Sequence, residues 1–588
     1  MHGMKFSLTI AGALLASVAV PVWADDVATA ATARTAPAVD VLIRGGSIYD
    51  GGGGDPYVGD VLITGDRIVA VTHGASGAKA GRTVDAKGLA VAPGFINMLS
   101  WATESLLLDG RGMSDIKQGV TLEVMGEGWS MGPMNPEMKA LAIQRQGDFK
   151  YDIPWTTLGN YLDYLTDKGI SPNVASFVGA GTVRVHVLGE GDVDPDAAQL
   201  GTMRALVHQA MQEGAMGVGS SLIYAPNAYA ETPELVALAT EAARCGGMYI
   251  SHMRSEGDHI EEAVDELIDI SRQSGAPAEI YHLKFAGKAN WGKYDAIIAK
   301  VEAARKAGQR ITADMYTYTA GATGLDAAMP TWVQAGGYEK WAERLKDPKI
   351  RARVIAEMKA PGQDWENLYN AAGTPDNLLL LAFKNPGLRD YTGKTLGEVA
   401  KLRGTSPEET AIDLVIEDGS RVGTAYFLMS EDNVRKAVDL PWMSFGSDEE
   451  AAAPEGLFLN AKHHPRAYGN VARLLGKYVR DEQATSLQSA IRRLTSLPAG
   501  NLGIRDRGTL APGYFADVVL FDPATVQDHA TFEEPDRYAT GVRDVFVNGV
   551  QVLKAGEHTG ATPGKVVRGP GWTGWPDGGA CAAGPARP

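Results

Sequence analysis

The chain has 588 residues, with 55 Lys and Arg side chains against 71 Asp and Glu, which gives a formal net charge of −16. An acidic chain without a Lys/Arg block repels nucleic acid and anionic lipid, so neither is expected as a partner. Its two cysteines, Cys245 and Cys581, exclude a fold defined by disulfides, and a bridge from a helix end to a Gly/Pro-rich tail is not expected. The length fits one large decorated domain with a smaller second domain.

The N-terminus has the pattern of a cleaved signal peptide over residues 1–24. A short charged start precedes an apolar run from Phe6 to Val20, and Ala24 offers a small residue at the cleavage point. A membrane anchor is the alternative, but the run is shorter than the roughly 20 residues that span a bilayer. We therefore expect export, with the periplasm as the destination and no membrane association after cleavage. Residues 25–38 then form a linker.

Short strands separated by glycine turns occur near both ends of the mature chain. Residues 39–92 contain Asp-Val-Leu-Ile-Arg-Gly-Gly and Asp-Val-Leu-Ile-Thr-Gly-Asp, and residues 500–557 contain Phe-Ala-Asp-Val-Val-Leu-Phe-Asp and Val-Phe-Val-Asn-Gly-Val. These patterns are typical of a small β domain, so we expect both segments to form one β-sandwich. The Gly, Pro and Ala content of residues 558–588 predicts a flexible tail.

Residues 93–499 alternate strand-like and helix-like stretches, which predicts an α/β fold with a (β/α)8 barrel. Eight strands are predicted, at residues 93–97, 121–125, 173–178, 217–221, 248–252, 279–282, 310–314 and 442–446. One helix is expected to start at Thr232, as the N-cap before Pro233, and to stop at Gly246. Another is expected over residues 258–273. The long gap at about 320–440 predicts a lid or substrate-binding insertion.

Two histidines end neighbouring predicted strands, His252 in Met-Tyr-Ile-Ser-His and His282 in Glu-Ile-Tyr-His. The chemistry of such barrels lies at the carboxyl ends of their strands, so both imidazoles can face one metal ion. Glu127, in a Gly-Glu-Gly loop after the second strand, would supply an oxygen ligand. Two imidazoles and a carboxylate leave a fourth position for water, which is the open arrangement of catalytic zinc. One Zn²⁺ per chain is therefore expected.

Further polar residues follow other predicted strands. Asp448, in Phe-Gly-Ser-Asp after the eighth strand, is a candidate catalytic base and acid, because a carboxylate beside activated water can accept its proton and return it to a leaving nitrogen. Lys284, Tyr316 and Arg466 are candidates for binding an anionic substrate group. Arg254 and Glu256, in the loop after His252, are possible supports for the ligands.

These motifs resemble the D-aminoacylases, the N-acyl-D-amino-acid deacylases of the amidohydrolase superfamily, over nearly the whole mature chain. The matching segments include Val-Ala-Pro-Gly-Phe-Ile-Asn, Ser-His-Met-Arg-Ser-Glu-Gly, His-Leu-Lys-Phe-Ala-Gly-Lys-Ala-Asn-Trp-Gly, Met-Ser-Glu-Asp-Asn-Val-Arg and His-Pro-Arg-Ala-Tyr-Gly. The resemblance implies a metal-dependent hydrolase barrel with a β-sandwich, zinc at His252 and His282, and Asp448 as base and acid. It also implies that Lys284, Tyr316 and Arg466 bind the α-carboxylate of the substrate.

Two positions depart from the pattern of this superfamily. Its members normally carry His-x-His at the end of the first strand, where this chain has Leu99 and Trp101. Neither side chain can coordinate zinc, so the outer metal position is expected to be missing. Glu127 stands where the family has a cysteine ligand, and a carboxylate is a harder donor than a thiolate.

The resemblance implies zinc-dependent hydrolysis of the amide bond of N-acyl-D-amino acids, which releases a D-amino acid and a carboxylate. The expected partner is thus a small N-acyl amino acid, and the preference for D over L rests on the resemblance alone. Alternatives are a related amidase or dipeptidase for another carboxylate-bearing amide, a ligand-binding pseudoenzyme, and ring opening or deamination of a cyclic substrate. The acyl group, the amino-acid side chain and the oligomeric state stay open.

Overall fold

The computed structural model describes residues 39–581. The predicted signal peptide (1–24), the predicted linker (25–38) and the last seven residues of the predicted tail lie outside this range. Within it, no helix combines the length and the apolar character that crossing a membrane requires.

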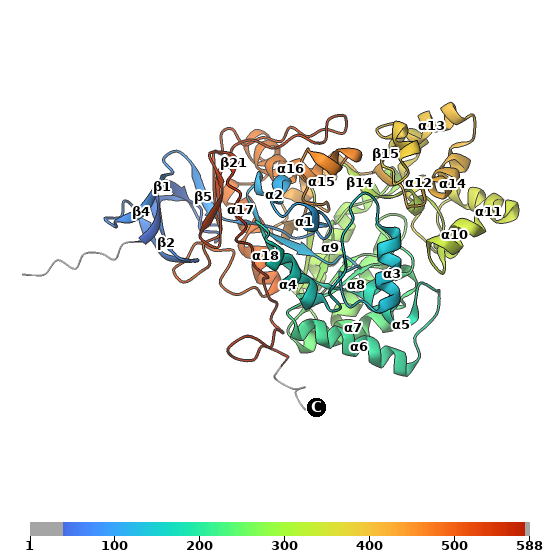
Figure 1. Ribbon diagram of the computed structural model, residues 1–588, viewed down its shortest axis with the longest axis horizontal. Coiled ribbons are helices and arrows are strands. Elements are labelled where there is room, and N and C mark those ends of the chain that lie inside the picture. Colours follow the sequence, from blue (N-terminus) through green and yellow to red (C-terminus); the bar gives the residue numbers. More distant parts are fainter. Residues whose placement is uncertain (1–38, 582–588) are drawn as a thin grey trace, which may run out of the picture. The chain divides into compact units, whose positions relative to one another are not determined.

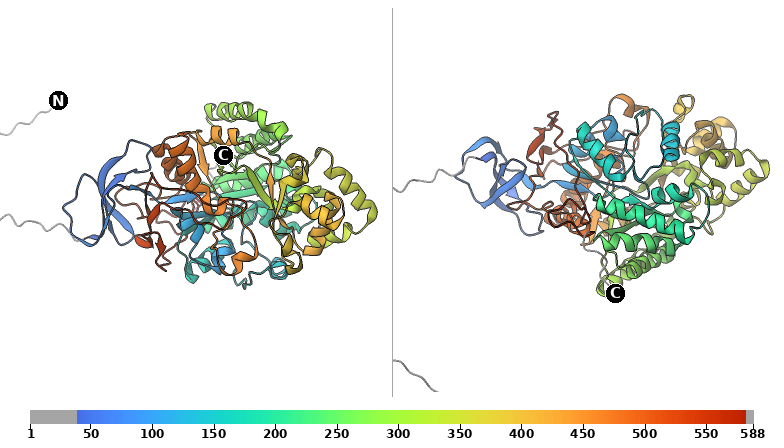
Figure 2. Two further views of the ribbon diagram at one scale, coloured as in Figure 1. Left: turned by 90° about the horizontal axis from the view of Figure 1, so that it is seen from above. Right: turned by 60° about the horizontal axis from the view of Figure 1, so that its bottom comes forward.

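All eight strands predicted for the central region overlap strands of the structure, and they lie in two parallel sheets. One sheet has the order β17-β13-β12-β11-β10-β9 and the other the order β6-β7-β8 (Figures 1 and 2). The strands are β6 (Phe95–Asn97), β7 (Val120–Met125), β8 (Asn173–Ser176), β9 (Val178–Gly179), β10 (Gly217–Ser221), β11 (Met248–His252), β12 (Ala278–Ile280), β13 (Ile311–Met315) and β17 (Met443–Phe445).

These strands are buried along nearly their whole length, as expected for parallel strands with both faces covered. Their register brings the carboxyl ends to one edge, because Ser221 pairs with His252 and Ile280 pairs with Ser251. Backbone hydrogen bonds also connect the two sheets. The Met98 amide donates to the Phe445 carbonyl at 3.0 Å, so the residues after β6 lie beside β17.

Helices follow most of these strands, as the sequence predicts. They are α5 (Ala180–Leu188), α6 (Ala197–Gln212), α7 (Thr232–Arg244), α8 (Ile260–Ser274), α9 (Tyr294–Lys306) and α15 (Glu431–Val438). Helix α7 begins one residue earlier than predicted: Thr232 is its first helical residue rather than the N-cap, and its hydroxyl donates to Glu266. Helix α8 ends at Ser274, one residue beyond the predicted end, and Gly275 follows as its C-cap with a φ of 74°, the left-handed conformation typical of that position.

Strands from both ends of the chain form one nine-stranded sheet. Its order is β21 (Glu557–His558), β20 (Val550–Lys554), β19 (Val542–Val547), β18 (Val518–Phe521), β5 (Ala90–Pro93), β1 (Val39–Ile48), β2 (Tyr57–Thr64) and β3 (Arg67–His73), with β4 (Ala80–Asp85) paired to β1. The two ends meet where β5 pairs antiparallel with β18, so that Val91 lies opposite Leu520.

The insertion has a small antiparallel sheet and a hydrophobic core of its own. The sheet has the order β14 (Ala320–Gly324), β16 (Gly423–Phe427), β15 (Leu378–Ala382). Its helices are α10 (Tyr338–Arg344), α11 (Pro348–Met358), α12 (Leu368–Ala372), α13 (Leu396–Arg403) and α14 (Pro407–Asp418). Trp341, Leu380 and Leu414 are among the residues of this core. In Figure 1 these yellow helices lie on the side of the parallel strands that is remote from β1–β4 (blue).

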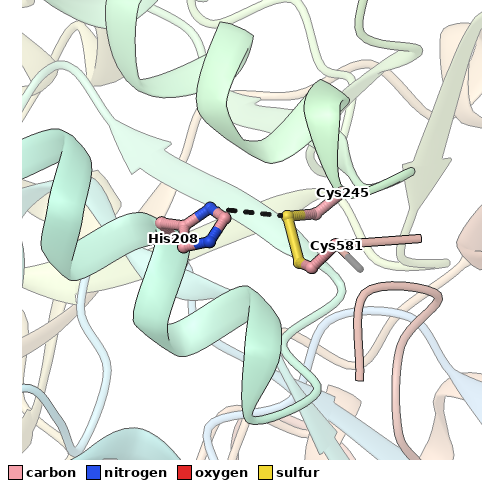
Figure 3. A group of neighbouring side chains, drawn as sticks. All are labelled: His208, Cys245 and Cys581. Carbon is pink, nitrogen blue, oxygen red and sulfur yellow. Dashed lines mark hydrogen bonds between the residues drawn. A yellow bond between two sulfur atoms is a disulfide. The ribbon is translucent and has the colours of Figure 1, made fainter. Parts of the chain in front are cut away.

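The C-terminal segment differs from the flexible tail that its composition predicts. Cys581 forms a disulfide with Cys245, directly after α7, and His208 of α6 lies beside the pair, with Nδ1 3.8 Å from the Cys245 sulfur (Figure 3). The expectation that the two cysteines stay unlinked was wrong. Backbone hydrogen bonds also tie the segment down: the Gly569 amide donates to Gly214 and the Thr573 amide to Gln212. The Gly, Pro and Ala content predicts that the segment cannot form a hydrophobic core of its own. Composition carries no information about the disulfide and the hydrogen bonds to distant residues that hold it in place.

Candidate active site

One cavity of about 610 Å³ lies at the carboxyl edge of the parallel strands. It is lined by every predicted site residue, namely Glu127, His252, His282, Lys284, Tyr316, Asp448 and Arg466. Each of them except Arg466 ends a strand or follows one closely, and Arg466 is the first residue of α16 (Arg466–Arg473). The side chains that were predicted to meet because they follow neighbouring strands therefore do lie together in one cavity.

The candidate metal ligands are the most tightly clustered of these residues. One oxygen of Glu127, Oε1, lies 2.9 Å from Nδ1 of His252 and 3.1 Å from Nε2 of His282. All three side chains are buried, and their ligand atoms lie within 4.8 Å of one another. Two imidazole nitrogens and one carboxylate oxygen are donors that zinc accepts.

Glu256 lies behind both imidazoles, on the side away from Glu127. Its Oε1 is 3.0 Å from Nδ1 of His282, and its Oε2 is 3.5 Å from Nε2 of His252. For His282, an N–H on Nδ1 directed at Glu256 leaves Nε2 with a free lone pair facing Glu127, which is the tautomer that a metal ligand needs. Nε2 of His252 makes no hydrogen bond within residues 39–581. The geometry thus fits a cation between Glu127 and the two rings.

The electrostatics of this cluster agree with its geometry. Burial by itself would raise the pKa of Glu127, but the imidazoles of His282 and His252 hold it below its ordinary range. Burial and Lys284 both oppose a charge on His282, yet Glu256 and Glu127 together raise its pKa to about 10. The carboxylates therefore favour positive charge on His282, and a divalent ion can replace the proton that its imidazole would otherwise hold.

Asp448 is held in one orientation by contacts on several sides. Trp101 donates from Nε1 to Oδ1 at 3.0 Å, and the Asp448 amide donates to the Leu99 carbonyl at 2.8 Å. Arg466 donates from Nη2 to the Asp448 carbonyl at 2.7 Å, and its Nη1 lies 2.9 Å from Oδ2 in an ion pair without hydrogen-bond geometry. The φ of Asp448 is +54°, a left-handed conformation that costs a non-glycine residue roughly 1 kcal/mol or more.

The three residues predicted to bind an anion also lie together. The Arg466 guanidinium is 4.4 Å from the centre of the Tyr316 ring, and Lys284 Nζ is 5.5 Å from the same ring. Lys284 already donates to Glu256 at 2.7 Å. By contrast, the buried hydroxyl of Tyr316 and the Nε and Nη1 atoms of Arg466 have no hydrogen-bond partner among residues 39–581. These donors are the ones a substrate carboxylate would satisfy.

Comparisons with known proteins agree with this site. The Amidohydrolase family profile matches residues 82–553. The chain is 32% identical to the D-aminoacylase of Alcaligenes xylosoxydans xylosoxydans over 90% of its own length and 97% of that protein, and 32% identical to the N-acyl-D-glutamate deacylase of the same organism over 90% and 96%. This chain belongs to the D-aminoacylase family of amidohydrolases. A solved member, the N-acyl-D-glutamate deacylase of Bordetella bronchiseptica with zinc and a phosphonate inhibitor, matches with a TM-score of 0.75 at 30% identity, over 90% of this chain and all of that one.

In this D-aminoacylase family member, the two positions that lack the usual His-x-His have other contacts. Leu99 is completely buried in a hydrophobic cluster with Met98 and Leu122. Trp101 lines the cavity, and its indole N–H is bonded to Asp448. At the two positions of the His-x-His motif the chain therefore has a buried hydrocarbon outside the cavity and an N–H donor within it, and neither side chain can coordinate a cation.

Sequence reasoning missed one candidate and undervalued two. Glu449, the residue after Asp448, was not among the candidates; it lines the cavity, and burial raises its pKa to about 7. Glu256 was only a candidate support for the ligands. Trp101 was noted only because it cannot coordinate zinc, whereas its indole N–H bonds Asp448. Arg254 instead binds Glu266 and the backbone of Ala228 and Ala230, away from the imidazoles. For Glu256, the available signal was its position in the loop directly after His252, which keeps it close to that imidazole.

Proposed function

We propose that this chain hydrolyses the amide bond of N-acyl-D-amino acids and releases a D-amino acid and a carboxylate. The observation that carries the proposal is the cavity itself. It places a cation-binding cluster, an oriented aspartate and unsatisfied donors for a carboxylate side by side. Identity of 32% to a D-aminoacylase over nearly the full length of both chains supports the same reaction.

The proposed cofactor is one zinc ion per chain, held by Glu127, His252 and His282. When bound, zinc supplies Lewis-acid polarisation of the scissile carbonyl and acidifies a water molecule. Glu256 would keep the imidazole of His282 in the ligating tautomer. A single ion follows from the first-strand side, because Leu99 and Trp101 provide no donor for a second.

Asp448 is the proposed base and acid of the reaction. It accepts a proton from the attacking water, whose oxygen forms the new bond to the carbonyl carbon. It then delivers that proton to the amide nitrogen as the carbon–nitrogen bond breaks, so that an amine and a carboxylic acid leave. The N–H of Trp101 fixes Oδ1, and Oδ2, which lies beside Arg466 Nη1, is the oxygen left to accept the proton.

Arg466 and Tyr316 are the proposed contacts of the substrate's α-carboxylate. Their free donors lie next to Asp448, so a carboxylate bound there places the adjacent amide nitrogen within reach of the proton donor. Lys284 adds positive charge nearby, but its ammonium group is already bonded to Glu256. Its part is to hold Glu256 behind the imidazoles and to complement the anion at longer range.

The finer architecture is part of the same proposal. We infer that the two parallel sheets close into one (β/α)8 barrel, because the Met98 amide bonds to Phe445 on one side and the Met216 amide, directly before β10, bonds to Ser176 of β8 on the other. The strands from both chain ends would then form the companion β-sandwich. Closure supports the site by fixing the spacing between Glu127, Asp448 and the two histidines.

Export to the periplasm is also proposed. The N-terminal pattern of residues 1–24 favours it, and the disulfide between Cys245 and Cys581 supports it, because such bonds persist in oxidising compartments. Thiol titration of the denatured protein from a periplasmic fraction should find no free thiol, and Cys245→Ser should reveal one. Recovery of uncleaved protein with two free thiols from the cytosol would refute this part.

The activity is tested with a panel of N-acetyl D-amino acids, their L-enantiomers and a set of dipeptides. Zinc-loaded enzyme should release amino acid from the N-acetyl-D compounds and far less from the L series. Turnover of dipeptides alone would favour a dipeptidase instead. Binding of the N-acetyl-D compounds without any turnover would identify a pseudoenzyme.

A further inference from the structure

Arg421 of the insertion reaches into the same cavity, although no step above uses it. It lies between α14 and β16, and its carbonyl accepts a hydrogen bond from the Leu325 amide at 2.8 Å. Its side chain is 49% exposed, whereas Lys284 and Arg466, which also line the cavity, are buried. This guanidinium is therefore open to a ligand inside the cavity.

The side chain is held in place along one edge only. Nε lies 2.9 and 2.8 Å from the two oxygens of the buried Asp326, and Nη2 donates to Thr323 at 3.3 Å. Gly324 leaves the room for this arrangement, because a Cβ there would lie 2.7 Å from the Cβ of Arg421. Nη1 makes no hydrogen bond to any residue of the described range. Asp326 thus orients the guanidinium and leaves part of its donor edge free.

One aromatic ring separates Arg421 from the candidate metal ligands. Its guanidinium carbon lies 5.1 Å from the centre of the Tyr224 ring, and that ring lies edge-on to His252 at a centroid distance of 5.1 Å. A substrate amide beside His252 would therefore extend one of its substituents along Tyr224 towards Arg421. The α-carboxylate has its own donors at Tyr316 and Arg466, so Arg421 serves a different group.

We propose that Arg421 binds a second carboxylate of the substrate and so selects dianionic N-acyl-D-amino acids. The inference rests on the proposed function and names its substrate class. A guanidinium pairs with a carboxylate through two parallel N–H donors. It therefore binds a carboxylic acid substrate more tightly than the amide of the same shape. The second carboxylate comes either from an acidic side chain, as in D-glutamate, or from a dicarboxylic acyl group.

Three substrates separate these sources: N-acetyl-D-glutamate, N-acetyl-D-glutamine and N-succinyl-D-glutamine. The wild-type enzyme should favour one of the two acids over N-acetyl-D-glutamine by about 10- to 100-fold in kcat/KM, the range that one charge-assisted pair supports. Arg421→Met should abolish that preference, chiefly through KM, and leave turnover of N-acetyl-D-glutamine within about threefold. Arg421→Lys keeps the charge and should retain part of the preference.

Arg353→Met is the matched control, because Arg353 of α11 stacks on Trp332 at 3.9 Å in the same insertion and does not line the cavity. It should leave the preference intact. Equal turnover of all three substrates by the wild type, or a preference that survives in Arg421→Met, would overturn the inference. Failure of the wild type to hydrolyse any of them would instead refute the proposed function together with it.

Discussion

The two sides of the cavity have opposite chemistry, although both are built from strand ends. On the side of β7, β11 and β12, Glu127 and Glu256 enclose two imidazoles and attract positive charge to them. On the side of β6, Leu99 is buried in hydrocarbon and Trp101 presents an N–H donor. The residues after β7, β11 and β12 thus offer donors that suit a cation, whereas the side chains of Leu99 and Trp101 after β6 offer none.

This difference indicates how the site compensates for its missing histidines. A second cation could orient Asp448 by charge, but here the indole of Trp101 and the guanidinium of Arg466 hold the carboxylate. The aspartate is positioned by neutral and cationic donors of the protein itself.

The largest effect is expected from Asp448→Asn. The amide has nearly the shape of the carboxylate but cannot accept the water proton, so kcat should fall by about 10²- to 10⁴-fold. Zinc content should stay unchanged, because Asp448 is not one of the three ligands. Glu450→Gln, on a neighbouring cavity residue bonded to His463, is the control and should retain most activity. Near-normal turnover by Asp448→Asn would remove this residue from the mechanism.

Trp101→Phe should have a smaller effect. It keeps an aromatic ring and removes the one hydrogen bond to Asp448 Oδ1, which corresponds to about a 10-fold loss of kcat with little change in KM. Trp129→Phe is the matched control, since Trp129 lines the same cavity and makes no bond to Asp448. If both variants lose activity equally, the indole acts through packing and the orienting role is wrong.

The pH dependence of stability tests the loop behind the imidazoles. Glu366 of the insertion is buried there and accepts hydrogen bonds from the Ser255 hydroxyl at 2.6 Å and the Glu256 amide at 3.2 Å. Burial, with the charge of Glu256, raises its pKa from 4.5 to about 7. Because the folded state binds this proton more tightly, its contribution to the free energy of unfolding is complete below pH 4.5 and is lost as the pH rises to about 7.

Glu366→Gln removes this titration. Between about pH 4.5 and 7, the variant should gain stability relative to the wild type by at most about 1.4 kcal/mol per pH unit, measured by denaturant unfolding. Glu137→Gln, on the exposed face of α3 (Pro136–Arg145), should follow the wild type throughout. Parallel pH profiles for Glu366→Gln and the wild type would show that Glu366 does not titrate in this range.

Local signals in the sequence predicted the strands and the positions of the site residues well. Strands β10 and β11 have the predicted bounds, because each is a short run bounded by glycine or by a polar residue that ends it. Strand-end placement also predicted that His252 and His282 would meet. Both inferences need only neighbours along the chain and the rule that parallel strands share a carboxyl edge.

Contacts between distant residues were beyond such reasoning. Trp101 and Asp448 are 347 positions apart, so the bond between them could not be read from either motif. The disulfide joins residues 336 positions apart. No bridge was expected, because the composition of the C-terminal tail suggested a flexible segment. Arg466 was expected only to bind an anionic group of the substrate, but it also forms an ion pair with Asp448. Sequence spacing does not show that one side chain contacts a second residue in this way.

The central claim is that Glu127, His252 and His282 hold a single divalent ion in this cavity, and metal analysis of purified protein tests it most directly. The wild type loaded with zinc and freed of excess should contain about one equivalent per chain, and His252→Ala and His282→Ala should each contain less than about a tenth of that. His463→Ala removes a cavity-lining histidine outside the cluster and should keep the wild-type content. Two equivalents in the wild type, or an unchanged content in His282→Ala, would contradict the account.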